Sequence, residues 1–125
     1  MSVQSYRDLV AWKKAIALAK TIYRATEQFP RAETYGLTAQ LRRAAVSIPS
    51  NIAEGQGRHS TGEFVQFLGT ARGSLFEVET QVVLARDFGF LSVEAADQVL
   101  AETTELARVL QGLIASLTKP HPMRA

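Results

Sequence analysis

The sequence contains no cysteine, which excludes disulfide bonds and thiolate metal sites. Its two histidines, His59 and His121, do not follow a carboxylate at the Glu-x-x-His spacing of di-iron bundles. No Ser/His/Asp set is framed for nucleophilic catalysis, and the glycine pair Gly55 and Gly57 lacks the preceding strand of a phosphate loop. These absences predict a protein that is not an enzyme and uses neither a metal nor a cofactor.

Long apolar runs are also missing. No uninterrupted apolar stretch approaches the roughly 18–20 residues of a membrane span. The first eight residues lack the apolar segment of a signal peptide, and the absence of cysteine suits a reducing compartment. We therefore expect a cytoplasmic protein with no membrane partner. A chain of 125 residues fits one domain, here 1–125, with an ordered core over about 6–118 and a flexible tail over 119–125.

Charge is unevenly distributed, although the net charge is only +2. Residues 1–60 hold nine Lys/Arg against four Asp/Glu, a net +5, whereas residues 61–125 hold five against eight, a net −3. A basic half attracts phosphate backbones. The same pattern arises when the two halves attract each other within the fold or between subunits, so both interpretations stay open.

Four segments repeat apolar residues with the helical period of 3.6, and none alternates with period two. The first ends near Phe29-Pro30, because proline disfavours helical geometry in the preceding residue. Its apolar face consists of Leu9, Trp12, Ile16, Ala19 and Tyr23, and we assign the rings of Trp12 and Tyr23 to the core. The second segment covers about 35–55, where Gly55 supplies a C-terminal stop.

The third segment opens with the capping box Ser60-Thr-Gly-Glu63 and runs to about Asp87. Gly89 breaks it, Ser92 caps the fourth segment, and that helix extends to about Leu117. Four helices joined by short turns predict an all-α protein, an antiparallel up-and-down four-helix bundle.

Two of these helices have more than one apolar face. The second directs Leu37, Leu41, Ala44, Ile48 and Ile52 to the core. Further apolar residues fall outside the core faces of the second and third helices, and we expect them at an oligomer interface: Val46, Pro49, Ala53, Val65, Gly69, Phe76 and Val83. The alternative is a wide core face with isolated surface apolar residues.

A polar row flanks the core face of the second helix, and it consists of Gln40, Arg43, Ser47, Asn51 and Glu54. Pro49 frees the carbonyl of Ala45, which predicts a bend beside this row. The row fits either a small-ligand or anion site or a set of bridges between helices. Both interpretations predict polar side chains at these positions.

Basic residues are the candidates for contact with RNA or another nucleic acid: Lys13, Lys20, Arg24, Arg42, Arg43, Arg58 and Arg72. No recognised nucleic-acid-reading module is present, so such contact is expected to be with phosphates. The alternative is a protein-interaction scaffold whose basic residues only pair with acidic ones.

The chain resembles the small bacterial four-helix bundle proteins named after the intervening sequences of 23S ribosomal RNA. The matching residues cover about 6–118 and include Asp8-Leu9, Trp12, Lys14-Ala15, Tyr23, Phe29-Pro30, Glu33, Tyr35-Gly36-Leu37, Gln40, Arg42-Arg43-Ala44, Ser47-Ile48, Asn51-Ile52-Ala53-Glu54-Gly55, Arg58, Phe67-Leu68, Ala71, Gly73-Ser74-Leu75 and Glu77. The resemblance implies an up-and-down bundle that forms a homopentamer and has no established enzymatic activity.

Overall fold

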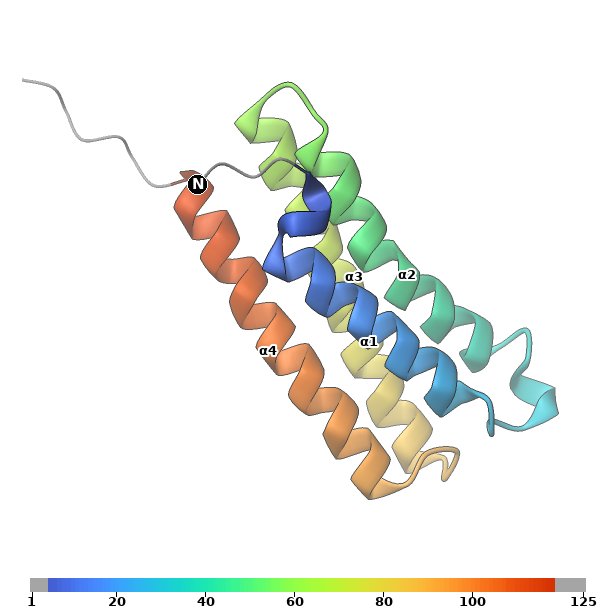
Figure 1. Cartoon of the computed structure of the whole chain (residues 1–125). Helices are drawn as coiled ribbons and strands as arrows, with labels where there is room; N and C mark the ends of the chain where they lie inside the picture. Colours follow the sequence, from blue (N-terminus) through green and yellow to red (C-terminus); the bar gives the residue numbers. More distant parts are fainter. Residues whose placement is uncertain (1–4, 119–125) are drawn as a thin grey trace, which may run out of the picture.

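The computed structural model describes residues 5–118, which form four long α-helices and two short 3-10 helices (Figure 1). They follow one another as η1 (Tyr6–Asp8), α1 (Val10–Thr26), η2 (Arg31–Glu33), α2 (Leu37–Gln56), α3 (Thr61–Asp87) and α4 (Val93–Thr118). The described part of the chain contains no strand, so the predicted all-α four-helix bundle is confirmed. The tail expected over 119–125 lies outside the described residues.

The predicted cap and stop residues at both ends of α3 and at the start of α4 adopt the expected conformations and hydrogen bonds. The Oγ of Ser60 accepts a hydrogen bond from the N–H of Glu63 at 3.1 Å, which caps α3. Gly89 follows the end of α3 with a φ of +81°, a left-handed conformation that glycine adopts at no steric cost. The Oγ of Ser92 then accepts from the N–H of Ala95 at 3.1 Å and caps α4.

Each helix packs against the helix before it and the helix after it, and α4 returns to pack against α1. The bundle therefore has four sides, each formed by two neighbouring helices: α1/α2, α2/α3, α3/α4 and α4/α1. One end carries the short turn between α2 and α3. The other end carries the α1–α2 connection with η2 and the α3–α4 turn (Figure 1).

The interior is filled by aliphatic side chains from all four helices. The largest fully buried ones are Leu18, Ile22, Leu41, Ile48, Ile52, Leu68, Leu75, Val78, Val82, Val99, Leu106 and Leu110. Burying one such side chain contributes about 1.5–3 kcal/mol relative to leaving it in water. The five core residues predicted on α2 are all buried.

The core face predicted for α1 is shifted from the observed one, because Leu9, Trp12 and Ala19 are only partly buried against the core. The buried apolar residues of this helix are Ala11, Ala15, Leu18 and Ile22, whereas the ring of Tyr23 is 43% exposed. Small alanines let α1 approach its neighbours closely, so the stripe that contains Trp12 and Ala19 lies at the edge of the core and Tyr23 is exposed. Like α2 and α3, α1 thus has a second apolar stripe.

Two expectations for α2 are also corrected. Pro49 was placed opposite the core, among the interface candidates, but it is buried inside the bundle, because α2 packs on both α1 and α3 and its buried face is wide. Gly55 does not stop the helix, which continues to Gln56. Gly55 is buried where α2 crosses α3: a Cβ atom there would lie 2.6 Å from the Cβ of Phe67.

Candidate functional site

The polar row of α2 lies along the α2/α3 side. The Oγ atoms of Ser47 and Ser74 are 2.9 Å apart and share a hydrogen bond between the two helices. The Nδ2 of Asn51 donates to the carbonyl of Ser47 at 2.8 Å and to its Oγ at 3.0 Å. At the other end of the row, the Nε2 of Gln81 donates to the Oε1 of Gln40 at 3.2 Å.

The outer members of the row behave differently. Glu54 forms an ion pair at 3.4 Å with Arg58, which lies in the turn after α2, and Arg43 is exposed. Gln81 is only 7% exposed, and its buried Oε1 has no hydrogen-bond partner among the described residues. The central polar atoms of the row therefore form hydrogen bonds within α2 and across to α3, which is the arrangement of a structural bridge.

Arg42 is committed to the contact between α1 and α2. Its Nε donates to the Oγ1 of Thr26 at 2.8 Å, and a terminal guanidinium nitrogen donates to the carbonyl of Tyr23 at 3.2 Å. The guanidinium also lies 4.5 Å from the centroid of the Tyr23 ring. A cation at the carbonyl end of a helix is favourable, so Arg42 caps α1 from the neighbouring helix.

Adjacent arginines therefore have different predicted effects on stability. We expect Arg42→Ala to lower the free energy of unfolding by about 1.5–3 kcal/mol, because it removes hydrogen bonds from a charged group at a helix end. Arg43→Ala, at an exposed position on the same helix, is the matched control and should stay within about 0.5 kcal/mol. Urea unfolding of both variants measures the difference; equal stabilities would show that Arg42 does not cap α1.

The other basic candidates are spread over the bundle. Arg58 and Arg72 lie over aromatic rings of α3, 4.7 Å from the Phe67 centroid and 5.2 Å from the Phe76 centroid. Lys13, Lys20 and Arg24 are exposed along α1, and no ion pair among residues 5–118 engages them. The seven residues do not share one surface. We call the three on α1 the basic ridge.

The α1/α2 side carries half-exposed apolar residues. Thr26 and Arg42 join the two helices there, and residues spaced three or four apart from them lie on the same side. On α1 these are Trp12, Ile16, Ala19 and Tyr23; on α2 they are Val46, Pro49 and Ala53. Tyr23 and Val46 are each 43% exposed, and Ile16 and Ala53 are half-buried.

The α3/α4 side also carries half-exposed apolar residues. The Oγ1 of Thr103 on α4 donates to the Oε2 of Glu79 on α3 at 2.7 Å, which marks this side. Residues spaced three or four apart from this pair are Val65, Gly69, Arg72, Phe76 and Val83 on α3, and Leu100 and Ala107 on α4. Phe76 is 44% exposed, while Val65, Val83, Leu100 and Ala107 are half-buried.

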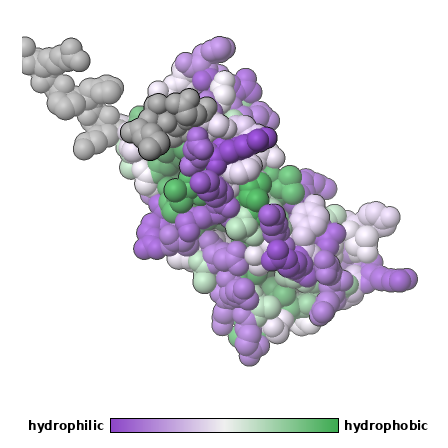
Figure 2. Space-filling model, viewed as in Figure 1, coloured by the Kyte–Doolittle hydropathy of each residue, from purple (hydrophilic) through white to green (hydrophobic). Residues whose placement is uncertain are grey.

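The two remaining sides are polar. The α2/α3 side holds the serine and glutamine bridges, and on the α4/α1 side the Oγ1 of Thr21 donates to Glu102 at 3.0 Å. Figure 2 shows hydrophobic patches separated by hydrophilic side chains on one face of the molecule. Apolar and polar sides thus alternate around the bundle, with the α1/α2 side opposite the α3/α4 side.

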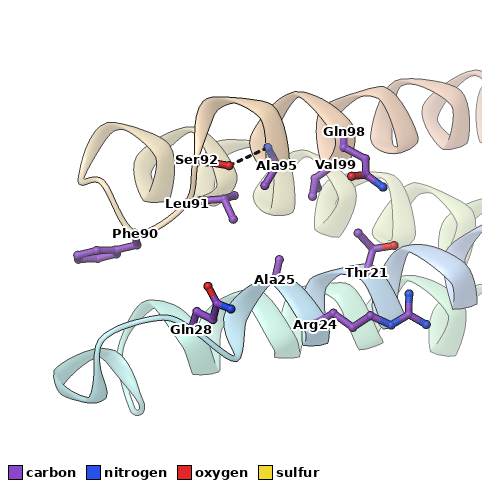
Figure 3. A pocket seen from close by; sticks show the side chains of 10 residues that line it. All are labelled: Thr21, Arg24, Ala25, Gln28, Phe90, Leu91, Ser92, Ala95, Gln98 and Val99. Atoms are coloured by element: carbon purple, nitrogen blue, oxygen red, sulfur yellow. Dashed lines mark hydrogen bonds between the residues drawn. The ribbon is translucent and has the colours of Figure 1, made fainter.

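A cavity of about 410 Å³ opens between α1 and α4 near the α3–α4 turn (Figure 3). Arg24 of the basic ridge is one of its lining residues. Sequence patterns did not reveal this cavity, because its residues come from two helices and their adjoining turns, far apart in the chain.

Within 5–118, no three His, Cys, Asp or Glu side chains come together as a metal site. The helices described are too short or too polar to cross a membrane.

A hydrogen bond from Arg108 lowers the pKa of exposed Glu105, and such surface pairs contribute little to stability.

Comparison with known proteins is consistent with this architecture. The structure is similar to the crystal structure of a protein of unknown function from the S23 ribosomal protein family of Bacteroides thetaiotaomicron, with a TM-score of 0.76 and 22% sequence identity. The match covers 84% of this chain and 98% of the other. No curated protein matches the sequence. The model of the 23S rRNA-intervening sequence protein family matches residues 7–112, and the chain belongs to that family.

Proposed function

We propose that this protein is a non-enzymatic assembly protein whose copies form a closed ring. The α1/α2 side of one copy packs against the α3/α4 side of the next. The supporting observation is the pair of half-exposed apolar sides, each with an aromatic ring more than 40% exposed, on opposite sides of one bundle. Exposed apolar patches mark protein interfaces. The family resemblance favours five copies.

The position of the two sides supports a ring over a two-fold dimer. A two-fold dimer joins one patch to its own copy and would leave the second apolar side in water. A contact between two different patches repeats from copy to copy and closes into a ring when the rotation permits. In that ring the polar α2/α3 and α4/α1 sides remain accessible.

Engineered cysteines test this contact without background, because the natural chain has no cysteine. Under mild oxidation, a Val46→Cys/Phe76→Cys double variant is expected to give a ladder of disulfide-linked chains on denaturing gels. The ladder should end at the number of copies in the ring. Each single variant should remain one chain. Covalent dimers from either single variant would instead indicate a two-fold contact and contradict the ring.

Nucleic-acid binding is a second proposed activity, supported by the basic ridge. Lys13, Lys20 and Arg24 are seven and four residues apart, about 10 and 6 Å along the helix axis. They are exposed on α1, where a phosphate backbone can approach. A ring repeats the ridge in every subunit, which raises the avidity for a long RNA without any new contact.

Salt dependence measures this activity. Binding of a structured RNA should weaken by orders of magnitude between about 50 and 200 mM salt if many phosphates are contacted. Replacing Lys13, Lys20 and Arg24 with Gln should reduce the slope of log K against log salt by about one for each lost phosphate contact. Arg108→Gln, at an exposed position on α4, is a control for general charge effects. No RNA binding at the lower salt would leave a protein-interaction scaffold.

A further inference from the structure

We propose that the cavity between α1 and α4 binds one nucleotide, with an unpaired base inside it and the adjacent phosphate on Arg24. This inference rests on the nucleic-acid binding proposed above, and it assigns that activity a second subsite. The cavity lies at the end of the bundle that carries the α3–α4 turn (Figure 3). Thr21 and Ala25 of α1 and Gln28 of the turn after it reach into the cavity, and Leu91 and Val99 face them (Figure 3).

The polar groups of the cavity divide into two kinds. Thr21 already donates to Glu102, and Ser92 already caps α4. Arg24, Gln28 and Gln98 form no side-chain hydrogen bond or ion pair within residues 5–118. One guanidinium and two carboxamides are therefore available to a ligand.

These three groups match the chemistry of a nucleotide. A carboxamide presents a donor and an acceptor side by side, and it can bond the edge of a base through both. A guanidinium binds phosphate through two parallel hydrogen bonds. One positive charge beside two neutral amides suits a ligand that is anionic at one end and uncharged at the other.

The apolar lining and the volume of the cavity further narrow the range of ligands that fit it. Ala25, Leu91 and Val99 give the cavity an apolar wall, and the ring of Phe90 stands at the turn. Small-molecule sites occupy roughly 300–1,000 Å³, so a cavity of about 410 Å³ takes one small ligand. A base stacked within a duplex cannot enter it, which selects single-stranded segments or free nucleotides.

The cavity continues the basic ridge. Arg24 is both the last member of the ridge and a lining residue of the cavity. A strand whose phosphates follow Lys13 and Lys20 along α1 would bring its next nucleotide to Arg24. Phosphate contacts on the ridge would then hold the strand, while the cavity would select an unpaired base.

The test uses the double variant Gln28→Ala/Gln98→Ala in the full-length chain, with Gln111→Ala as control. All three residues are exposed, so the fold should be retained. The probes are adenosine 5′-monophosphate, adenosine, inorganic phosphate, a short single-stranded RNA and a duplex of the same sequence. The wild type should bind the monophosphate more tightly than adenosine or phosphate, and the single strand more tightly than the duplex.

In the double variant, binding of the monophosphate and of the single strand should weaken about tenfold, while duplex binding and the assembled mass stay unchanged. Monophosphate binding without single-strand binding would identify a free nucleotide as the ligand and support the cavity. Unchanged binding of both probes in the double variant would overturn the cavity assignment and leave RNA binding by the ridge intact. Loss of monophosphate binding in a Lys13→Gln/Lys20→Gln variant, which keeps Arg24, would place recognition on the ridge and also overturn the cavity assignment.

Discussion

Gly55→Ala is expected to lower the free energy of unfolding by about 1–3 kcal/mol, although alanine is a better helix former than glycine. The added Cβ would lie 2.6 Å from the Cβ of Phe67, 3.0 Å from the Cδ1 of Phe64 and 3.3 Å from the carbonyl oxygen of Phe64. One of these neighbours is backbone, and the nearest is the rigid root of a side chain. The two helices must therefore move apart.

Gly112→Ala is the matched control, because Gly112 lies inside α4 and a Cβ there meets no atom within 4 Å. This substitution should raise the stability by about 0.5–1 kcal/mol, the ordinary gain from removing glycine from a helix. Thermal unfolding at one protein concentration measures both variants, since self-association makes the transition depend on concentration. A stabilised Gly55→Ala would contradict the close approach of α2 and α3.

Phe76→Glu is expected to dissociate the assembly into single folded chains. Phe76 is 44% exposed in one chain, so glutamate remains hydrated there and the monomer keeps its fold. In the proposed ring the same position is covered by the α1/α2 side of the next copy. Even with Arg72 beside it, moving this carboxylate out of water at each contact is unfavourable. Light scattering should show the mass of one chain, and circular dichroism should show unchanged helix content.

Thr70→Glu is the control for this experiment. Thr70 is exposed on the same helix, four residues before Ser74, and therefore lies toward the polar α2/α3 side. It adds the same charge and should leave the assembled mass unchanged. If Phe76→Glu keeps the wild-type mass, the α3/α4 side is not an interface; if both variants dissociate, general charge repulsion is responsible.

Helical period and capping residues were sufficient to predict the elements of the fold. The capping box at Ser60, the stop near Gly89 and the cap at Ser92 all operate through local hydrogen bonds and backbone angles, which depend only on nearby residues. The core face of α1 could not be found in the same way. In a helical projection, large side chains such as Trp12 appear to define the apolar face. The buried face of α1 instead contains Ala11 and Ala15, and the contribution of such small residues to packing depends on how closely the neighbouring helices approach.

Site residues were harder to predict, because their roles depend on contacts between helices. Arg42 and Arg43 are adjacent and chemically identical, yet only Arg42 reaches Thr26. Pro49 lies in a stripe with exposed Val46, yet it is buried where α2 packs in the bundle. The α1–α4 cavity joins Gln28 to Gln98 across 70 residues of chain, and no sequence pattern links those positions.

The alternation of apolar and polar sides explains the composition of each helix. The second apolar stripes of α1, α2 and α3 are unnecessary in a monomeric bundle, since one apolar stripe per helix suffices there. They match in pairs on two different sides of this bundle, and a contact between different sides closes into a ring when its rotation permits. The polar sides are then left for other ligands.

The mass of the wild-type protein in solution tests this account most directly. Size-exclusion chromatography with light scattering at micromolar concentration should give about five times the 13.7 kDa of one chain. A mass of 13.7 kDa under these conditions would contradict the proposed ring.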